Sequence, residues 1–500
     1  MNFLKFKPLT FLEKLKVKRN LIGIILFAII IGITAFLDIT LAVGIILIGF
    51  LSLITFLILS KTKIKSKALY AFLLIVLLIH FGAVLFIHYA HFQPFGRGSS
   101  GYGDYNADYI EYNVIAQQLA TRIHQGNFSL QELKTVNDYP AIVGYIYALT
   151  LPEMLIGQLF AVWSAAISVL LVYLIVLEIG GTEKQALLIG LITAIYPSHL
   201  FYGSLLLKDT LVIPLVLAGL LLTIKLIKNF SLRNFLILYI VLAGATHFRF
   251  YVGYALIATF IISWFLLSKM DFKKRILYGI IFIVFLGFIP QFAAGQGYYG
   301  INSVKTYLNP NTVNFYRQVA YTPPTTPPSA AAPVATPPSA AAPVATPSPT
   351  TGIDSSFATE NSPLGYIKSF VYVSLGPFPW QIKNLRQSFI LLETIPWYFL
   401  LFFIIKGIIM ALQRKRIALP LLIFSIILLG TLAIFITNFG IVTRIRIPAF
   451  ISLLCIASLG FNKNNIICNY LEKIYGKVFN CAGCFCQANH KTKNQSKLYL

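Results

Sequence analysis

Hydrophobic runs alternate with short polar segments along most of the chain. The first run, residues 21–60, is interrupted by one charged residue, Asp38. A membrane-spanning helix needs about 20 apolar residues, so this run predicts two spans that turn at Asp38. Later runs predict ten more, at 68–90, 156–177, 184–202, 209–227, two short spans between 234 and 268, 276–293, 389–411, 418–437 and one that begins near Pro448. The pattern predicts an all-α polytopic membrane protein of about twelve spans.

Basic residues fill the segments that a twelve-span arrangement places together on one side. These segments are 1–20, 61–67, 269–275, 414–416 and the Lys-rich tail. Cytoplasmic loops of membrane proteins carry an excess of Lys and Arg. We therefore expect both termini in the cytoplasm.

The first large outer loop, residues 91–155, contains two segments that we expect to be juxtamembrane helices. Residues 141–151 are apolar but too short to cross a core about 30 Å thick. Between 108 and 123, apolar residues recur at helical spacing, which predicts an amphipathic helix. Its apolar positions would be Ile110, Val114, Ile115 and Leu119. Asp108 could serve only as the cap of this helix.

These features divide the chain into five parts. We expect a basic tail and accessory helical hairpin at 1–67, a catalytic membrane core at 68–293, an outer loop at 294–388, C-terminal transmembrane helices at 389–461 and a cytoplasmic Lys/Cys tail at 462–500. Within the outer loop, PPSAAAPVAT occurs twice in succession, in a Pro/Ala/Thr linker at 322–352. Such sequence favours an extended linker without catalytic residues.

Composition narrows the class of protein. Hydrophobic residues make up 57% of the chain and charged residues 11%, whereas soluble domains carry about 25% charged residues. The net charge of +24 is accounted for by cytoplasmic loops and anionic lipid, so we expect no nucleic-acid partner. The expected location is the plasma (inner) membrane, with many spans.

Scarce carboxylates gather in the first outer loop. Five of the 16 acids in the chain lie between 101 and 140, namely Asp104, Asp108, Glu111, Glu132 and Asp138. The predicted topology places basic groups at the same outer boundary: Lys208 beside Asp209, His247 near Arg249, and Arg444 near Arg446. One arginine side chain can donate two parallel hydrogen bonds to phosphate oxygens. A carboxylate that faces the phosphate can take a proton from a hydroxyl. This combination suits group transfer from a phosphorylated lipid, with the active site outside the cytoplasm.

The order of these motifs resembles the GT-C superfamily of membrane glycosyltransferases, in particular protein O-mannosyltransferases and the lipid A aminoarabinose transferase (glycosyltransferase family 39-like). The resemblance covers about residues 68–461 and rests on four motifs. They are D-x-x-E-Y at Asp108, Glu111 and Tyr112; Tyr139-Pro140; Asp209 in LLLKD; and R-x-R-x-P at Arg444, Arg446 and Pro448.

The resemblance implies a polyprenyl-phosphate-sugar donor, an acceptor hydroxyl on a glycan, lipid or protein, and inversion at the anomeric carbon. Asp108 would be the base, with Asp104 as a competitor and Glu111 nearby, and Asp209 would position the acceptor or a metal. The other residues expected to bind substrate are Lys208, His247, Arg249, Tyr251, Arg444, Arg446 and Tyr139. No cofactor is assigned, and a divalent metal is left open, although the outer histidines are not at ligand spacing.

Other interpretations remain. Asp209 could pair with Lys208 or an arginine for stability alone, and Arg444 and Arg446 could anchor lipid headgroups. A transporter or flippase of lipid-linked glycans would show pseudo-symmetric halves and ionisable groups at mid-membrane. A glycan polymerase or ligase would rely on arginine and histidine without the first-loop carboxylate. The tail motif CAGCFC could be incidental, acylated or metal-binding.

Overall fold

The computed structural model describes residues 28–61, 66–90, 108–128, 138–283, 362–381, 391–435 and 439–461, with Asn309, Val313 and Ser388. These residues form helices and short connections, and no strand occurs among them. The prediction of an all-α chain is therefore confirmed for these ranges. Asp104, the Pro/Ala/Thr repeat and the cysteine-rich tail lie outside the described residues.

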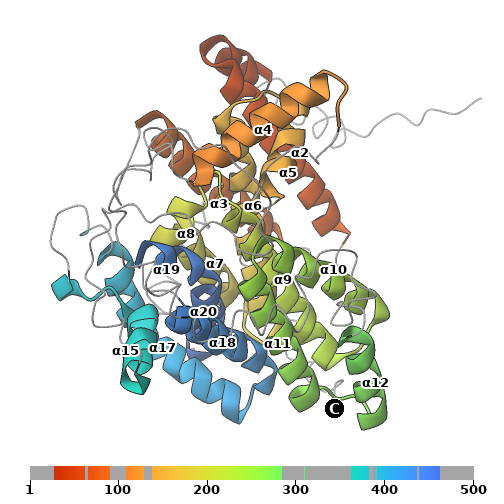
Figure 1. Ribbon diagram of the computed structural model, residues 1–500, viewed down its shortest axis with the longest axis vertical. Coiled ribbons are helices and arrows are strands. Elements are labelled where there is room, and N and C mark those ends of the chain that lie inside the picture. The colour runs from red at the N-terminus through yellow and green to blue at the C-terminus, as the bar shows by residue number, and fades with distance from the viewer. Residues whose placement is uncertain are drawn as a thin grey trace, which may run out of the picture.

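The helices follow one another with short breaks (Figure 1). They are α2 (Ile39–Ser60), α3 (Lys67–Ala90), α4 (Asp108–His124), α5 (Tyr139–Leu149), α6 (Met154–Glu178), α7 (Glu183–Ile195), α8 (Pro197–Tyr202), α9 (Asp209–Lys228), α10 (Leu232–Phe248), α11 (Phe250–Leu267), α12 (Phe272–Ile283), α15 (Pro363–Leu375), α17 (Leu391–Gln413), α18 (Leu419–Phe435), α19 (Phe439–Ile445) and α20 (Ile447–Gly460), with 3₁₀ turns η3 (Pro379–Gln381) and η4 (Arg416–Ala418).

Seven of the described helices are long and apolar enough to cross a membrane: α2, α3, α6, α9, α11, α17, and α18 together with η4. Four shorter apolar helices accompany them, namely Ala28–Leu37, α5, α10 and α20. The predicted break at Asp38 is present, since Asp38 caps α2 by accepting from the backbone N–H groups of Thr40 and Leu41. The count of twelve spans and the cytoplasmic termini stay predictions.

One predicted span is not a continuous helix. Residues 184–202 divide into α7 and α8 at Tyr196, because Pro197 cannot donate a backbone hydrogen bond and takes the first position of α8. With 13 residues, α7 is about 20 Å long at 1.5 Å per residue, shorter than the hydrocarbon core of about 30 Å. After the break, α8 packs against α3, α17 and α19.

The amphipathic helix α4 forms as predicted, and its buried face includes the predicted Leu119 but is shifted from the rest of the predicted apolar stripe. Val114 is exposed, whereas the inward positions are Tyr109, Tyr112, Ala116, Leu119 and Ala120. Except for Leu119, these residues form a small apolar cluster with residues of α5. At Gly144 of α5 a Cβ atom would lie 2.8 Å from Leu119 Cδ2, so glycine permits the close approach. The pair α4–α5 covers one end of the long helices (Figure 1).

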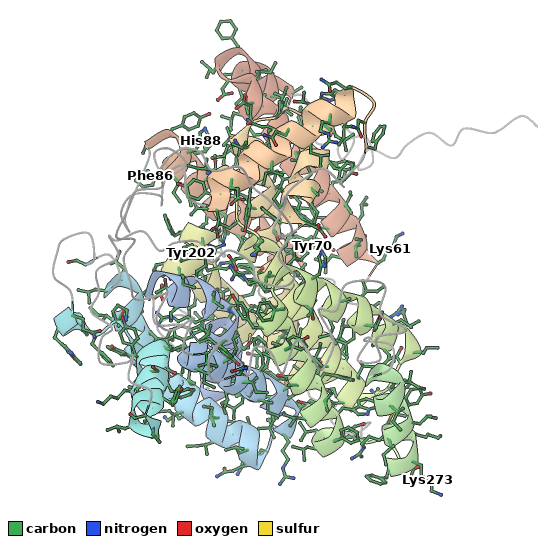
Figure 2. All side chains as sticks on the ribbon, viewed as in Figure 1. Lys61, Tyr70, Phe86, His88, Tyr202 and Lys273 are labelled. Atoms are coloured by element: carbon green, nitrogen blue, oxygen red, sulfur yellow. The ribbon has the colours of Figure 1, made fainter. Side chains whose placement is uncertain are left out.

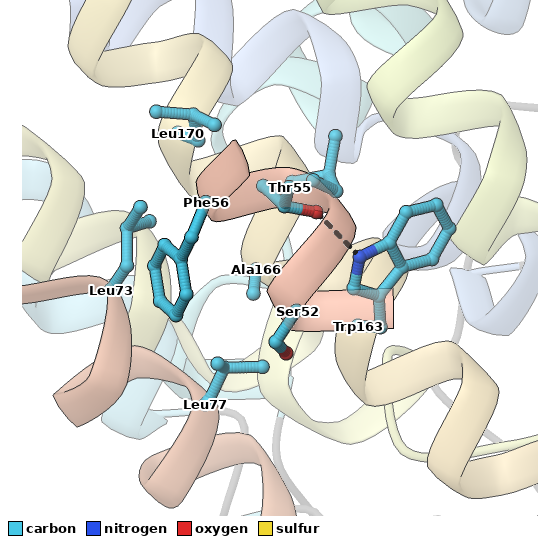
Figure 3. A pocket seen from close by; sticks show the side chains of 9 residues that line it. Ser52, Thr55, Phe56, Leu73, Leu77, Trp163, Ala166 and Leu170 are labelled. Carbon is cyan, nitrogen blue, oxygen red and sulfur yellow. Dashed lines mark hydrogen bonds between the residues drawn. The ribbon is translucent and has the colours of Figure 1, made fainter. Parts of the chain in front are cut away.

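The central helices α6 and α9 are the most buried of the spans, and α17 packs closely on α20. A Cβ atom at Gly407 would meet the backbone oxygen of Ile456 at 2.2 Å. Nearby, the Trp397 and Phe450 rings stack with centroids 3.8 Å apart. By contrast, α2 is largely exposed and contacts α6 across a small apolar pocket, where Trp163 Nε1 donates to Thr55 Oγ1 at 3.0 Å (Figure 3).

Candidate active site

Four helix ends, far apart in the sequence, bring charged side chains together. Asp108 is the first residue of α4 and Asp209 is the first residue of α9. Arg249 is the single extended residue between α10 and α11, with φ −146° and ψ 92°. Arg444 lies in the last turn of the short helix α19. Breaks between helices place these side chains near helix ends and not in the middle of long helices.

Asp209 is the centre of the group. Arg249 Nε lies 2.5 Å from Asp209 Oδ1, and Arg249 Nη2 donates to Oδ2 at 2.7 Å. Arg444 Nε also donates to Asp209 Oδ2. The Asp209 side chain is only 5% exposed, so both of its oxygens are engaged by arginine. Asp209 therefore fixes the two guanidinium groups relative to each other.

Arg444 joins the two carboxylates. Its Nη1 donates to Asp108 Oδ2 at 2.8 Å, while its Nε binds Asp209. Within the part of the chain that the structure describes, the buried Arg444 Nη2 has no hydrogen-bond partner. A buried charged donor without an acceptor is costly. This nitrogen is thus available to an oxygen atom supplied by a ligand.

Asp108 differs from Asp209 in accessibility. Its side chain is 32% exposed and contacts one arginine. Burial would raise the pKa of the Asp108 carboxyl, but the Arg444 guanidinium more than offsets this and holds that pKa below its ordinary value. Asp108 is therefore ionised at neutral pH and can be approached from solvent. Of the two carboxylates, it is the better placed to receive a proton from a bound hydroxyl.

Lys208 adds a cation that can titrate near neutral pH. Burial, together with the positive charge of Arg249, lowers the pKa of the Lys208 ammonium to about 8. The pKa of the Arg444 guanidinium is raised instead, because Asp209 and Asp108 outweigh its burial. The group carries one net positive charge, because three cations (Lys208, Arg249 and Arg444) face two carboxylates. The group therefore attracts an anion.

Two predicted tyrosines border the group. Arg249 Nη1 donates to the hydroxyl oxygen of Tyr251. Tyr139 is fully buried under α4, with its ring 5.7 Å from that of Tyr112. Tyr251 thus restrains Arg249, and Tyr139 packs on Tyr112 of α4.

Three other predicted residues that the structure describes, Glu111, His247 and Arg446, lie outside the group. Glu111 is exposed on α4. His247 pairs with Asp138, and both side chains are about half exposed. Arg446 is buried, 2% exposed, and bound to Glu393. The proximity of Arg446 to Arg444 in sequence misleads, because Arg444 lies in the last turn of α19 whereas Arg446 is the N-cap of α20.

The described part of the chain has no group of three His, Cys, Asp or Glu side chains that could hold a metal. Both carboxylates of the group are bound to Arg444, and a guanidinium between two carboxylates occupies the place of a cation. The donor set as it stands does not fit a divalent metal.

Sequence reasoning missed Glu393. It is buried and lies in the apolar helix α17, where it accepts from Arg446, Tyr196 and Ser198. The available signal was an acid inside an apolar run, since placing such a residue in a membrane costs free energy and the residue is usually paired.

The dolichyl-phosphate-mannose-protein mannosyltransferase family model matches residues 140–293. This segment contains Lys208, Asp209, Arg249 and Tyr251. No curated protein sequence matches the chain. The family match confirms the resemblance to the GT-C superfamily and, with the many apolar helices, supports a multi-pass membrane glycosyltransferase of GT-C type.

Proposed function

We propose that the protein transfers a sugar from a polyprenyl-phosphate donor to a hydroxyl of a glycan, lipid or protein, on the extracytoplasmic side of the plasma membrane. The observation that carries the proposal is the group formed by Asp108, Asp209, Arg249 and Arg444. It combines an accessible carboxylate with two arginines, and together with Lys208 the group carries one net positive charge. The family match supports a lipid-linked sugar as the donor.

In this proposal the phosphodiester of the donor binds at Arg444, where the buried Nη2 has no acceptor. Arg249 and Lys208 complete the cationic side of the site. When phosphate oxygens take up the donors of Arg444, its contact with Asp108 is released. The substrate itself would thus free the base, because one guanidinium cannot serve Asp108 and the phosphate equally well.

The transfer would proceed as a displacement with inversion. The acceptor oxygen attacks the anomeric carbon while its proton passes to Asp108. The bond between the anomeric carbon and the phosphate oxygen breaks, and polyprenyl phosphate departs with the electron pair. Arg444, Arg249 and Lys208 stabilise the negative charge that grows on that oxygen. Asp209 keeps the arginines in place and does not exchange a proton.

The test uses purified protein in lipid vesicles with a panel of radiolabelled polyprenyl-phosphate sugars. We expect wild type to release polyprenyl phosphate from at least one donor, and Asp108→Asn to lose most of this rate while still binding donor. Transbilayer movement of labelled lipid without consumption of any donor would favour a transporter and reject the proposal. Retained transfer in Asp108→Asn would reject Asp108 as the base.

A further inference from the structure

A second group of charged side chains lies next to the candidate active site along the chain, because Arg446 is two residues after Arg444. Glu393 of α17 and Arg446 at the start of α20 form an ion pair at 3.0 Å, with side chains 5% and 2% exposed. We propose that Glu393 is a positioning residue that fixes Arg444 for phosphate binding. The inference rests on the proposed function, since it assigns a task to the support of that same site.

Glu393 joins three parts of the fold. Its Oε1 accepts from Tyr196 Oη at 2.7 Å and from Arg446 Nη2, while its Oε2 accepts from the Ser198 backbone N–H at 3.2 Å and from the Ser198 hydroxyl. Ser198 is in the first turn of α8. A carboxylate at a helix start is favourable, because the N–H groups there are otherwise unpaired.

Arg446 continues the connection. Its Nη1 donates to the carbonyl oxygens of Val373 at 3.1 Å and Gly376 at 2.7 Å, at the end of α15. Its guanidinium carbon lies 4.5 Å from the centroid of the Phe450 ring. These contacts fix the beginning of α20 and account for the burial of Arg446. They leave Arg446 directed at protein groups and not at a substrate.

Two routes lead from Glu393 to Arg444. One runs through Arg446, two residues farther along the chain. The other runs through α8, whose Tyr202 hydroxyl lies 3.2 Å from Thr443 Oγ1, next to Arg444; Figure 2 labels Tyr202. The helix α19 has only seven residues, too few to hold a fixed position on its own. The routes meet at its C-terminal end, where Arg444 contacts both carboxylates of the active site.

The test compares Glu393→Gln with wild type for kcat, KM and the Kd of polyprenyl phosphate, each per folded protein. Displacing a binding group by about 1 Å can cost about 100-fold in rate, so we expect kcat/KM to fall between tenfold and 100-fold and the Kd to rise. Glu393→Asp, which keeps the charge, should restore part of the loss. The control is Glu178→Gln. Glu178 pairs with Lys228 at 2.6 Å, and Lys228 is the last residue of α9 whereas Asp209 is the first.

A double-mutant cycle separates positioning from general stability. In an Arg444→Lys background, Glu393→Gln should lower kcat/KM by less than about threefold, because residues coupled through a shared network or backbone shift are not additive. If the loss is equal in both backgrounds, or tracks only the folded fraction, Glu393 is a structural residue and the proposal is rejected. Should Glu393→Gln not fold, the cycle is run with Glu393→Gln combined with Arg446→Met, which leaves no unpaired buried charge.

The proposed function can fail separately. If wild type consumes no donor, the glycosyltransferase proposal fails. The positioning role of Glu393 is then tested only by the Kd of polyprenyl phosphate. Equal Kd values for wild type and Glu393→Gln, or no binding by wild type, would then also reject the positioning role. A higher Kd in Glu393→Gln would support it without any transfer.

Discussion

Arg444 donates a hydrogen bond to Asp209 across 235 residues of sequence. The family match at 140–293 includes Asp209 but neither Arg444 nor Asp108. Through Arg444, Asp209 in the matched segment is connected to residues on both sides of that segment, because Arg444 also binds Asp108. A site composed of the matched residues alone would lack its most accessible carboxylate.

Replacing Asp108 should remove the base and leave the phosphate site in place. We expect Asp108→Asn to lower kcat by 10²- to 10⁴-fold, the usual contribution of general base catalysis, with a Kd for the donor within about threefold of wild type. The measurement is transfer of radiolabelled sugar in lipid vesicles, with equilibrium binding of the labelled donor. The control is Glu153→Gln, since Glu153 is an exposed carboxylate that makes no cap hydrogen bond at the start of α6. A comparable loss of kcat in that variant would contradict a specific role for Asp108.

Asp209 should matter for stability more than Asp108 does. Asp209→Asn leaves Arg249 and Arg444 buried beside a neutral group, and removal of one partner from a buried ion pair costs about 3–5 kcal/mol. Asp108 is partly exposed and shares one arginine, so Asp108→Asn should cost less than about 1 kcal/mol. Thermal unfolding of both variants in the same lipid checks this. Equal unfolding temperatures would show that Asp209 does not hold the arginines.

Donor binding should weaken as the pH rises through about 8, the pKa of Lys208. Below that pH the ammonium is charged and can bind phosphate; above it the charge is lost. A charge-assisted hydrogen bond contributes about 1.5–3 kcal/mol, so the Kd should rise by about tenfold or more. In Lys208→Arg the Kd should stay flat over this range, because arginine keeps its proton.

The same lowered pKa has the opposite effect on folding. The pKa of Lys208 is lower in the folded protein than its ordinary value of 10.5, so the charged form is destabilising. The free energy of unfolding should therefore rise, through this group, as the pH increases from about 8 to 10.5.

For the donor-binding prediction, a Kd that falls with pH, or that changes equally in Lys208→Arg, would exclude Lys208 from the phosphate site.

The contact between α17 and α20 offers a test of the fold. Gly407→Ala would place a Cβ atom 2.2 Å from the Ile456 carbonyl oxygen, and we expect a cost of about 1–3 kcal/mol from overpacking. Gly430→Ala in α18 is the matched control, because a Cβ atom there meets nothing within 4 Å. Thermal unfolding of the two variants should differ clearly; identical midpoints would contradict this helix contact.

The sequence by itself determined the helical class, the positions of most helices and the residue types of the site. Apolar run length shows where a helix can cross a membrane, and scarce charged residues beside such runs indicate chemistry. Asp108, Asp209, Arg249 and Arg444 were all identified in this way, because each marks a local break in the apolar pattern.

Only the tertiary structure decided which of these residues meet. Arg444 and Arg446 have the same motif context, yet one binds Asp108 and Asp209 while the other binds Glu393. The tyrosine face of α4 also depended on packing, whereas Pro197 marks the division of 184–202 locally in the sequence. The physical reason is that pairing between charged groups is set by distance and burial in space, and separations of 53 to 336 residues carry no periodic signal in the sequence.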